Sequence, residues 1–215
     1  MYRLLFFCLL AVCSLRAGTI VDNGLPLVSG VRDISLFRSA DDFTLQSAAN
    51  VTSIVFWFSS TSPVVANPNT NFSGSITYAF YFDAAGDIGS LITSGTVNGL
   101  TGTFSGLSHP GSNAGINVLQ FNTVVPVALA PGKYWLELHE GTTLSTSDGT
   151  NIGWETSAQT GNAKQGLAAN GIPGGFINAE YAFLLLDDGV ATPEPGSMAL
   201  VAVGLAFAVV RLRRR

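Results

Sequence analysis

The chain has 215 residues, of which 47% are hydrophobic and only 11% are charged. An average soluble domain has about 25% charged residues, and helical bundles and coiled coils need many of them at helical spacing, so those folds are disfavoured. Aromatic residues make up 10% of the chain and can fill a core, which argues against a charged disordered chain. The motifs GxxxxGK[ST], HExxH, CxxC and GxSxG do not occur, so the enzyme classes that they mark lose their simplest support.

The formal net charge of −4 is divided unevenly along the chain. Between positions 18 and 192, four basic residues stand against thirteen acidic ones, which is a net charge of −9. Phosphate binding needs clustered Lys and Arg, so we expect no nucleic-acid partner. The other basic residues lie in the first 17 and the last five positions, beside apolar segments, and this indicates a membrane context.

Residues 1–17 have the features of a secretory signal peptide. Arg3 supplies a positive charge, and residues 4–13 form an unbroken apolar run of the length of a signal-peptide core. We therefore expect an N-terminal signal helix that is cleaved at Ala17 or Gly18. Both cysteines lie inside this segment, so the mature chain would have no disulfide, no thiolate nucleophile and no cysteine-ligated metal.

The C-terminal segment combines three elements in a fixed order. It contains Pro193, Glu194 and Pro195, then thirteen apolar or glycine residues at 198–210, then the arginines Arg211, Arg213, Arg214 and Arg215. Counted from residue 196, the apolar run is about 22 Å long as a helix. We expect a transmembrane helix that is short for the roughly 30 Å hydrocarbon core, with its arginines on the cytoplasmic side.

These three elements, together with the signal peptide, resemble the PEP-CTERM sorting signal, and the resemblance covers residues 191–215. It implies export in a Gram-negative bacterium, temporary retention in the inner membrane, and processing near the motif by an exosortase. The family is associated with bacteria that make extracellular polysaccharide. Residues 40–44 and 130–136 are also similar to phrases that recur in the ectodomains of such proteins, and this similarity implies sandwich geometry rather than an activity.

Residues 18–190 predict an all-β ectodomain, an antiparallel β-sandwich that is jelly-roll-like. Residues 75–82 alternate so that Ile76, Tyr78, Phe80 and Phe82 share one face, as in a strand packed on a core. In residues 133–139, Tyr134, Leu136 and Leu138 should face inward, while Lys133, Trp135, Glu137 and His139 face outward.

Continuous apolar runs at 51–59 and 182–186 suit central strands. Further strand candidates are residues 19–22, 42–45, 91–97, 116–121, 124–129 and 152–156. About ten short strands separated by Gly, Pro and Asn turns are typical of a sandwich or barrel. Residues 161–175 predict a long loop, with one helical turn as the alternative.

Few residues indicate chemistry. We expect His109 and His139 to be ordinary surface histidines, because nothing in their spacing places them beside a nucleophile and a carboxylate. Asp83 and Asp87 could offer carboxylates to calcium, but they lack the fuller ligand series of an EF-hand loop, so they are only weak candidates.

The remaining acidic residues do not predict a shared acid–base site. Asp41 with Asp42, and Asp187 with Asp188, are adjacent pairs whose side chains would point to opposite faces of a strand. Glu137 and Glu140 would also diverge on a strand. No cofactor is expected.

Outward-facing Trp135, together with Trp57 and Trp154, raises the possibility of sugar stacking, against the ordinary alternative of core packing. The sequence as a whole predicts a non-enzymatic exported protein of the cell surface or extracellular matrix, sorted by an exosortase and associated with exopolysaccharide or biofilm. The alternatives are a carbohydrate-binding module and a secreted polysaccharide hydrolase. The expected partners are exosortase, the export machinery, the membrane before processing, and extracellular polysaccharide.

Overall fold

The computed structural model describes residues 18–62, 65–145, 149–167 and 175–187. The expected signal helix and the expected C-terminal transmembrane helix lie outside these residues. Residues Thr19–Asp187 form one compact unit, which is all-β apart from two short 3-10 turns, η1 (Pro68–Thr70) and η2 (Gly111–Asn113). Within the described ranges, no helix has both the length and the apolar character needed to cross a membrane.

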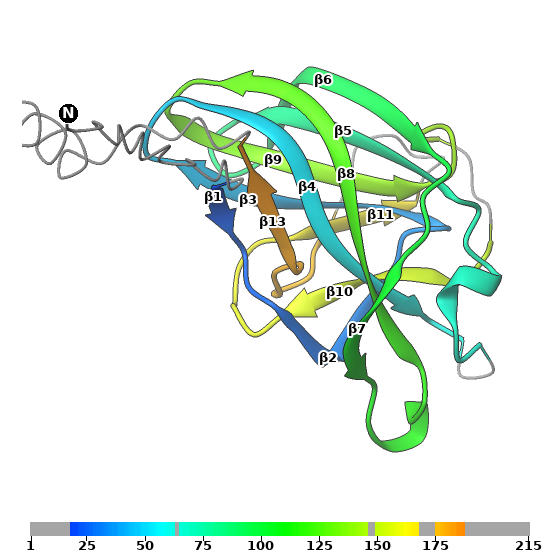
Figure 1. Ribbon diagram of the computed structural model, residues 1–215. Helices are drawn as coiled ribbons and strands as arrows, with labels where there is room; N and C mark the ends of the chain where they lie inside the picture. Colours follow the sequence, from blue (N-terminus) through cyan, green and yellow to red (C-terminus); the bar gives the residue numbers. More distant parts are fainter. Residues whose placement is uncertain (1–17, 63–64, 146–148, 168–174, 188–215) are drawn as a thin grey trace, which may run out of the picture. The chain divides into compact units, whose positions relative to one another are not determined.

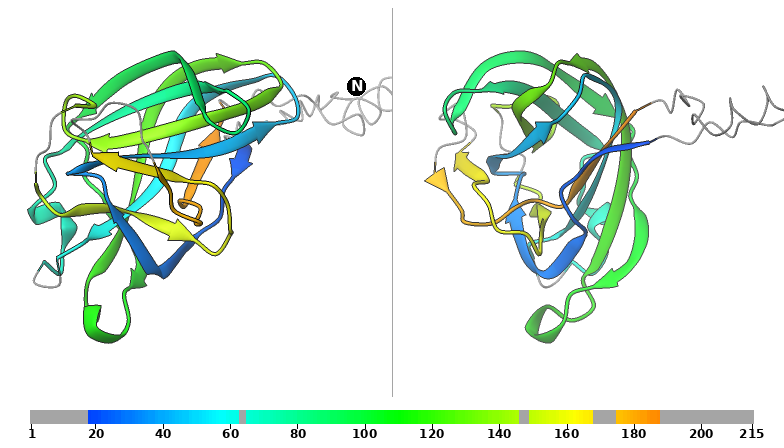
Figure 2. Two further views of the ribbon diagram at one scale, coloured as in Figure 1. Left: turned by 180° about the vertical axis from the view of Figure 1, so that it is seen from behind. Right: turned by 90° about the vertical axis from the view of Figure 1, so that its left-hand side faces the viewer.

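The strands form two antiparallel sheets, which face each other in Figures 1 and 2. The first sheet contains β1 (Thr19–Asp22), β2 (Pro26–Asp33), β4 (Ala49–Ser60), β7 (Thr103–Ser108), β8 (Asn117–Leu129), β10 (Ile152–Ser157) and β13 (Phe183–Leu186). The second contains β3 (Phe37–Leu45), β5 (Ser75–Asp83), β6 (Ile88–Asn98), β9 (Gly132–Glu140), β11 (Lys164–Leu167) and β12 (Gly175–Phe176).

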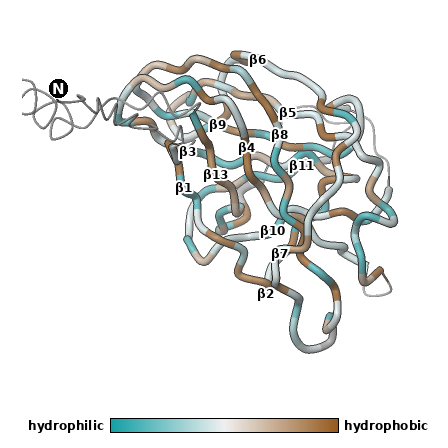
Figure 3. Tube along the Cα trace, in the orientation of Figure 1, coloured by the Kyte–Doolittle hydropathy of each residue, from teal (hydrophilic) through white to brown (hydrophobic). Residues whose placement is uncertain are grey.

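Strand β4 is the central strand of the first sheet. One of its edges pairs with β8, and the other pairs with β13 and then with β10. Strand β13 in turn lies between β4 and β1. The prediction that the two continuous apolar runs form central strands is therefore confirmed, and Figure 3 shows the hydrophobic character of both strands.

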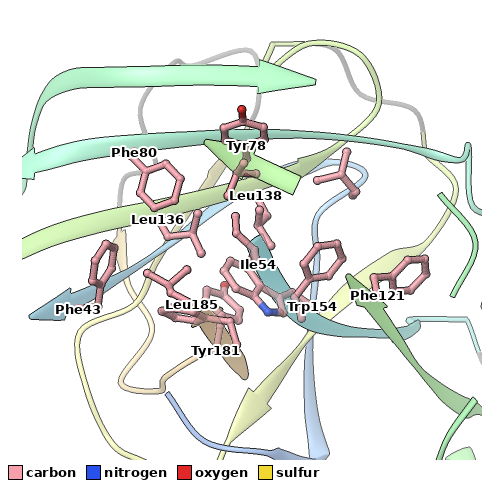
Figure 4. Packing of buried hydrophobic residues seen from close by; sticks show 14 of the residues in the cluster. Phe43, Ile54, Tyr78, Phe80, Phe121, Leu136, Leu138, Trp154, Tyr181 and Leu185 are labelled. Carbon is pink, nitrogen blue, oxygen red and sulfur yellow. The ribbon is translucent and has the colours of Figure 1, made fainter. Parts of the chain in front are cut away.

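The inner faces of both sheets bury one hydrophobic core. Its members from β5 and β9 are Ile76, Tyr78, Phe80, Tyr134, Leu136 and Leu138, as the alternation predicted. Facing them from the first sheet, the Trp154 ring stacks on the Tyr181 ring with centroids 4.4 Å apart (Figure 4). Phe82 continues the inner face of β5 but lies at its rim and is 51% exposed.

Other strand predictions need correction. The two strands predicted at 116–121 and 124–129 are one strand, β8, which begins at Asn117, and β2, β7, β11 and β12 were not predicted as strands. Residues 164–167, expected in a loop or a helical turn, form β11 because their backbone pairs with the edge of β3. That pairing joins segments more than 120 residues apart, so local sequence carries no signal for it.

Candidate functional site

Asp83 and Asp87, the weak calcium candidates, flank the turn between β5 and β6. The Asp83 carboxylate accepts hydrogen bonds from the Gly86 N–H at 2.9 Å and from Trp135 Nε1 at 3.0 Å. The Asp87 carboxylate accepts a bond from the Ile88 N–H and forms an ion pair with Lys164. Each carboxylate is thus already engaged, and the Lys164 ammonium occupies the position where a cation would compete. Calcium binding stays a prediction that this geometry does not favour.

The outer face of the second sheet holds a buried polar network. Arg38 Nη2 donates to Glu137 Oε2 at 2.8 Å and to the Tyr81 hydroxyl at 3.1 Å, and that hydroxyl donates to the same carboxylate oxygen at 2.6 Å. Burial and the neighbouring Glu137 charge raise the pKa of Tyr81, so its hydroxyl remains a donor. The three groups satisfy one another.

Trp135 lies on the same outer face, between two lysines. Lys133 Nζ is 5.9 Å and Lys164 Nζ is 5.3 Å from the ring centroid, within the range of cation–π contacts. Lys133 also pairs with Asp42 at 2.8 Å, and this hydrogen bond raises the pKa of Lys133.

Three of the four side chains of β9 that were expected to face solvent are buried, and only Lys133 is partly exposed. Trp135, Glu137 and His139 are fully buried. The chain that follows β9 folds back over this face. The Gly141 carbonyl accepts a hydrogen bond from Thr77 Oγ1, and the Thr142 carbonyl accepts one from Thr96 Oγ1. Leu144 packs against the apolar cluster that contains Trp135. The prediction that His139 is a surface residue was wrong.

The tryptophans do not form an exposed platform. Trp154 belongs to the core, Trp135 is buried as described, and Trp57 is 4% exposed on the outer face of the first sheet. The packing alternative is therefore confirmed for all three rings, and the basis for sugar stacking on tryptophan is lost.

A carboxyl pair that the sequence did not predict joins β3 to the segment before β13. Asn23 Nδ2 lies 2.8 Å from Asp41 Oδ2 and 3.0 Å from Glu180 Oε2, and the Tyr181 N–H donates to Asp41 Oδ2. Burial, followed by the hydrogen bond to Glu180, raises the pKa of Asp41 well above its usual range. Folding therefore favours the protonated form of the Asp41 carboxyl group.

Oxygen atoms of Asp41, Asp42 and Glu180 lie within 4.8 Å of one another, close enough in principle to hold a cation. The surrounding bonds do not fit that use. Asp41 favours its protonated form, and Asp42 is paired with Lys133. The hydrogen bonds of Asp41 and Glu180 instead fix Asn23 and Tyr181, which lie near the two ends of the unit, to strand β3.

His109 is also buried, at 6% exposed, so its surface assignment was wrong. Its Nε2 lies 2.7 Å from Glu155 Oε1 and 3.0 Å from Ser59 Oγ, on the outer face of the first sheet. A hydrolytic triad needs the serine and the carboxylate on different imidazole nitrogens. Here both contact the same nitrogen, and the Ser59 hydroxyl donates to Glu155, so the serine is not activated.

Two shallow hollows on the described surface are lined without titratable side chains. The first lies among Ala48, Ala49, Asn50, Ala128, Leu129 and Ala130, and the second among Thr101, Thr103, Gln120, Phe121 and Asn122. Neither hollow contains a histidine or a carboxylate. The buried titratable clusters therefore do not open into these hollows.

The sorting residues Pro193, Glu194 and Pro195, the terminal arginines and Ala17 lie outside the described residues; Gly18 is the first residue that the structure describes. Residues 191–215 match the family model of the PEP-CTERM protein-sorting motif, as the resemblance predicted. No curated protein matches the chain. The motif marks an exported, exosortase-targeted protein whose precursor is anchored in the membrane of a Gram-negative bacterium.

Proposed function

We propose that this chain is a non-enzymatic protein of the cell surface or extracellular matrix, released by exosortase processing and retained in exopolysaccharide or biofilm. Its ectodomain is a jelly-roll-like sandwich that acts as a stable structural unit with a binding surface and not as a catalyst. The observation that carries the proposal is the PEP-CTERM sorting motif at residues 191–215, joined to an all-β unit at Thr19–Asp187.

The state of the titratable clusters supports a non-catalytic role. General acid–base catalysis needs a group within reach of a substrate proton. Arg38 with Glu137, His109 with Glu155, and Asp41 with Glu180 are each mutually bonded and buried. These clusters stabilise the ectodomain instead of presenting reactive groups.

Packing of the hydrophobic core can keep the ectodomain folded outside the cell in the absence of disulfides. Both cysteines of the chain precede residue 18, so no disulfide can stabilise the ectodomain. Stacked pairs such as Phe56 with Phe121, at 5.5 Å between centroids, provide that packing, because aromatic pairs contribute about 0.5–1.5 kcal/mol beyond burial.

The test is fractionation of a polysaccharide-producing host that expresses the chain. We expect the processed protein in the surface polysaccharide fraction and its release when that polysaccharide is digested. As a control, a chain lacking residues 191–215 should be absent from the surface polysaccharide fraction, because it lacks the sorting motif. Processed protein that never associates with the polysaccharide, or purified protein that hydrolyses it, would contradict the proposal.

A further inference from the structure

The hairpin of β7 and β8 is attached to the rest of the unit at two levels. At its base, Gly102 and Asn69 exchange two hydrogen bonds, and near its tip, where Asn117 pairs with Ser108, the Asn117 N–H donates to the Ala66 carbonyl at 2.9 Å. The hairpin extends beyond this base at the lower edge of Figure 1. Gly106, Gly111 and Gly115 all have positive φ, a conformation that glycine adopts more readily than other residues.

His109 attaches the hairpin at the second level. Its Nε2 contacts Glu155 on β10 at 2.7 Å and Ser59 on β4 at 3.0 Å, while the Val28 carbonyl on β2 accepts a bond from the same imidazole. One side chain thus links the hairpin to three strands of the first sheet.

The contact lies on the same outer face of the first sheet as an apolar cluster. Val55, Trp57, Val118 and Ala182 form a cluster on the outer face of the first sheet, and Val28 packs against it. Glu155 is fully buried, and its Oε2 has no hydrogen-bond partner among the described residues. The cost of burying the Glu155 carboxylate is therefore offset by its contacts with His109 and Ser59.

The surrounding strands offer no second cation. Described residues of β4, β7, β8 and β13 carry no charged side chain, and β10 carries only Glu155. On β2, Arg32 is exposed, and the Asp33 carboxylate accepts bonds from Ser35 and Leu36. Loss of the imidazole proton would thus leave a buried carboxylate charge without its counter-ion.

We propose that protonated His109 is a latch that holds the tip of the β7–β8 hairpin to the neighbouring strands β4 and β10, and that this tip is released when the imidazole loses its proton. The two states are a closed hairpin with the His109–Glu155 ion pair and an open hairpin with both groups in water. Separation is favoured after deprotonation because an unpaired buried charge is costly.

The hydrogen bond to Glu155 raises the pKa of His109 above its ordinary value of 6.5. A group whose pKa is raised in the closed state stabilises that state fully below its ordinary pKa, and the stabilisation is lost as pH rises through the raised pKa. The latch is therefore closed in acid and opens on the alkaline side of pH 6.5. In that interval the opening constant should rise roughly tenfold per pH unit and then level off.

The experiment is hydrogen exchange followed by mass spectrometry on the full chain in detergent, across a pH series. Protection factors, corrected for the chemical exchange rate, are compared between residues 103–117 and β5 as an internal reference. We expect protection of the hairpin to fall roughly tenfold per pH unit above pH 6.5 while that of β5 stays constant.

Two conservative variants test whether His109 and Glu155 cause the effect. Glu155→Gln removes the charge that would be left unpaired, and His109→Gln keeps a donor for Glu155 that does not titrate, so both should give a pH-independent hairpin. His139→Gln, which changes the other histidine on the opposite sheet, should leave the wild-type pH dependence unchanged. Flat protection in the wild type, or a fall that persists in both latch variants, would overturn the proposal.

Discussion

Thr19, at the start of β1, lies opposite Leu186, at the end of β13, in an antiparallel pair. The first and last strands of the unit are therefore neighbours in the first sheet, and the Asn23 N–H extends the contact by donating to the Phe183 carbonyl at 3.0 Å. Because β13 also pairs with the central strand β4, the first sheet is complete only after residue 186 has been exported. Folding of the ectodomain is thus expected to finish late in export.

The inner face of β5 provides a direct test of strand phasing. Phe80→Asp places a carboxylate in the core, where Phe80 is fully buried, and should unfold the isolated unit or cost at least about 3–5 kcal/mol. The matched control is Phe82→Asp on the same face of the same strand, because Phe82 is 51% exposed. Thermal melts by circular dichroism should separate the two variants, and equal stability would show that the phasing is wrong.

Expressed alone, residues 18–187 should be soluble and β-rich, and their melting temperature should not change with reducing agent. The reason is that this stretch contains no cysteine, so no disulfide can contribute. A helical circular dichroism spectrum, or aggregation unless other segments are present, would contradict the described fold.

The buried Asp41–Glu180 pair should make the free energy of unfolding depend on pH. Since the pKa of Asp41 is raised by folding, its contribution is fully present below the unfolded value of about 3.9 and is lost as pH rises through the folded value. An asparagine side chain at this position would mimic the protonated carboxyl group, so Asp41→Asn should become more stable than the wild type toward alkaline pH. The slope for one proton is at most about 1.4 kcal/mol per pH unit.

Urea denaturation across a pH series measures this difference, with Asp42→Asn as the control. Asp42 pairs with Lys133, and its charge is the smallest of the influences that raise the pKa of Asp41, so its variant should keep most of the wild-type slope. An Asp41→Asn protein with an unchanged slope would show that Asp41 is ionised in the fold.

The buried guanidinium of Arg38 should be essential for stability, whereas exposed Arg32 should not. Arg38→Ala leaves Glu137 buried without a counter-ion and should cost about 3–5 kcal/mol. Arg32→Ala should stay within about 0.5 kcal/mol of the wild type. Chemical denaturation decides the matter, and near-identical midpoints for the two variants would exclude the proposed role of the network.

Alternation in the sequence was sufficient to place Tyr134, Leu136 and Leu138 in the core, because a strand with one buried face repeats every two residues. It failed for Trp135 and His139, since alternation indicates which face a residue occupies but not whether a later segment covers that face. Strand β2 gave no alternating signal: it begins with Pro26, contains Gly30, and has Val28 at positive φ.

The candidate sites were less predictable than the strands. His109 meets Glu155 and Ser59 across sequence separations of 46 and 50 residues, and Asp41 meets Glu180 across a separation of 139 residues. Such meetings depend on sheet order, which local patterns do not specify. The sorting motif was predictable because its three elements are contiguous, and the family match at residues 191–215 confirms it.

The central claim is tested most directly by intact mass measurement of the protein recovered from membranes and from the medium. We predict that the released wild type lacks the segment after the Pro193–Pro195 motif, that Glu194→Ala stays in the membrane with its C-terminus through Arg215, and that neighbouring Ser197→Ala is processed normally. A released wild-type protein that still ends at Arg215, or a normally trimmed Glu194→Ala protein, would contradict the account.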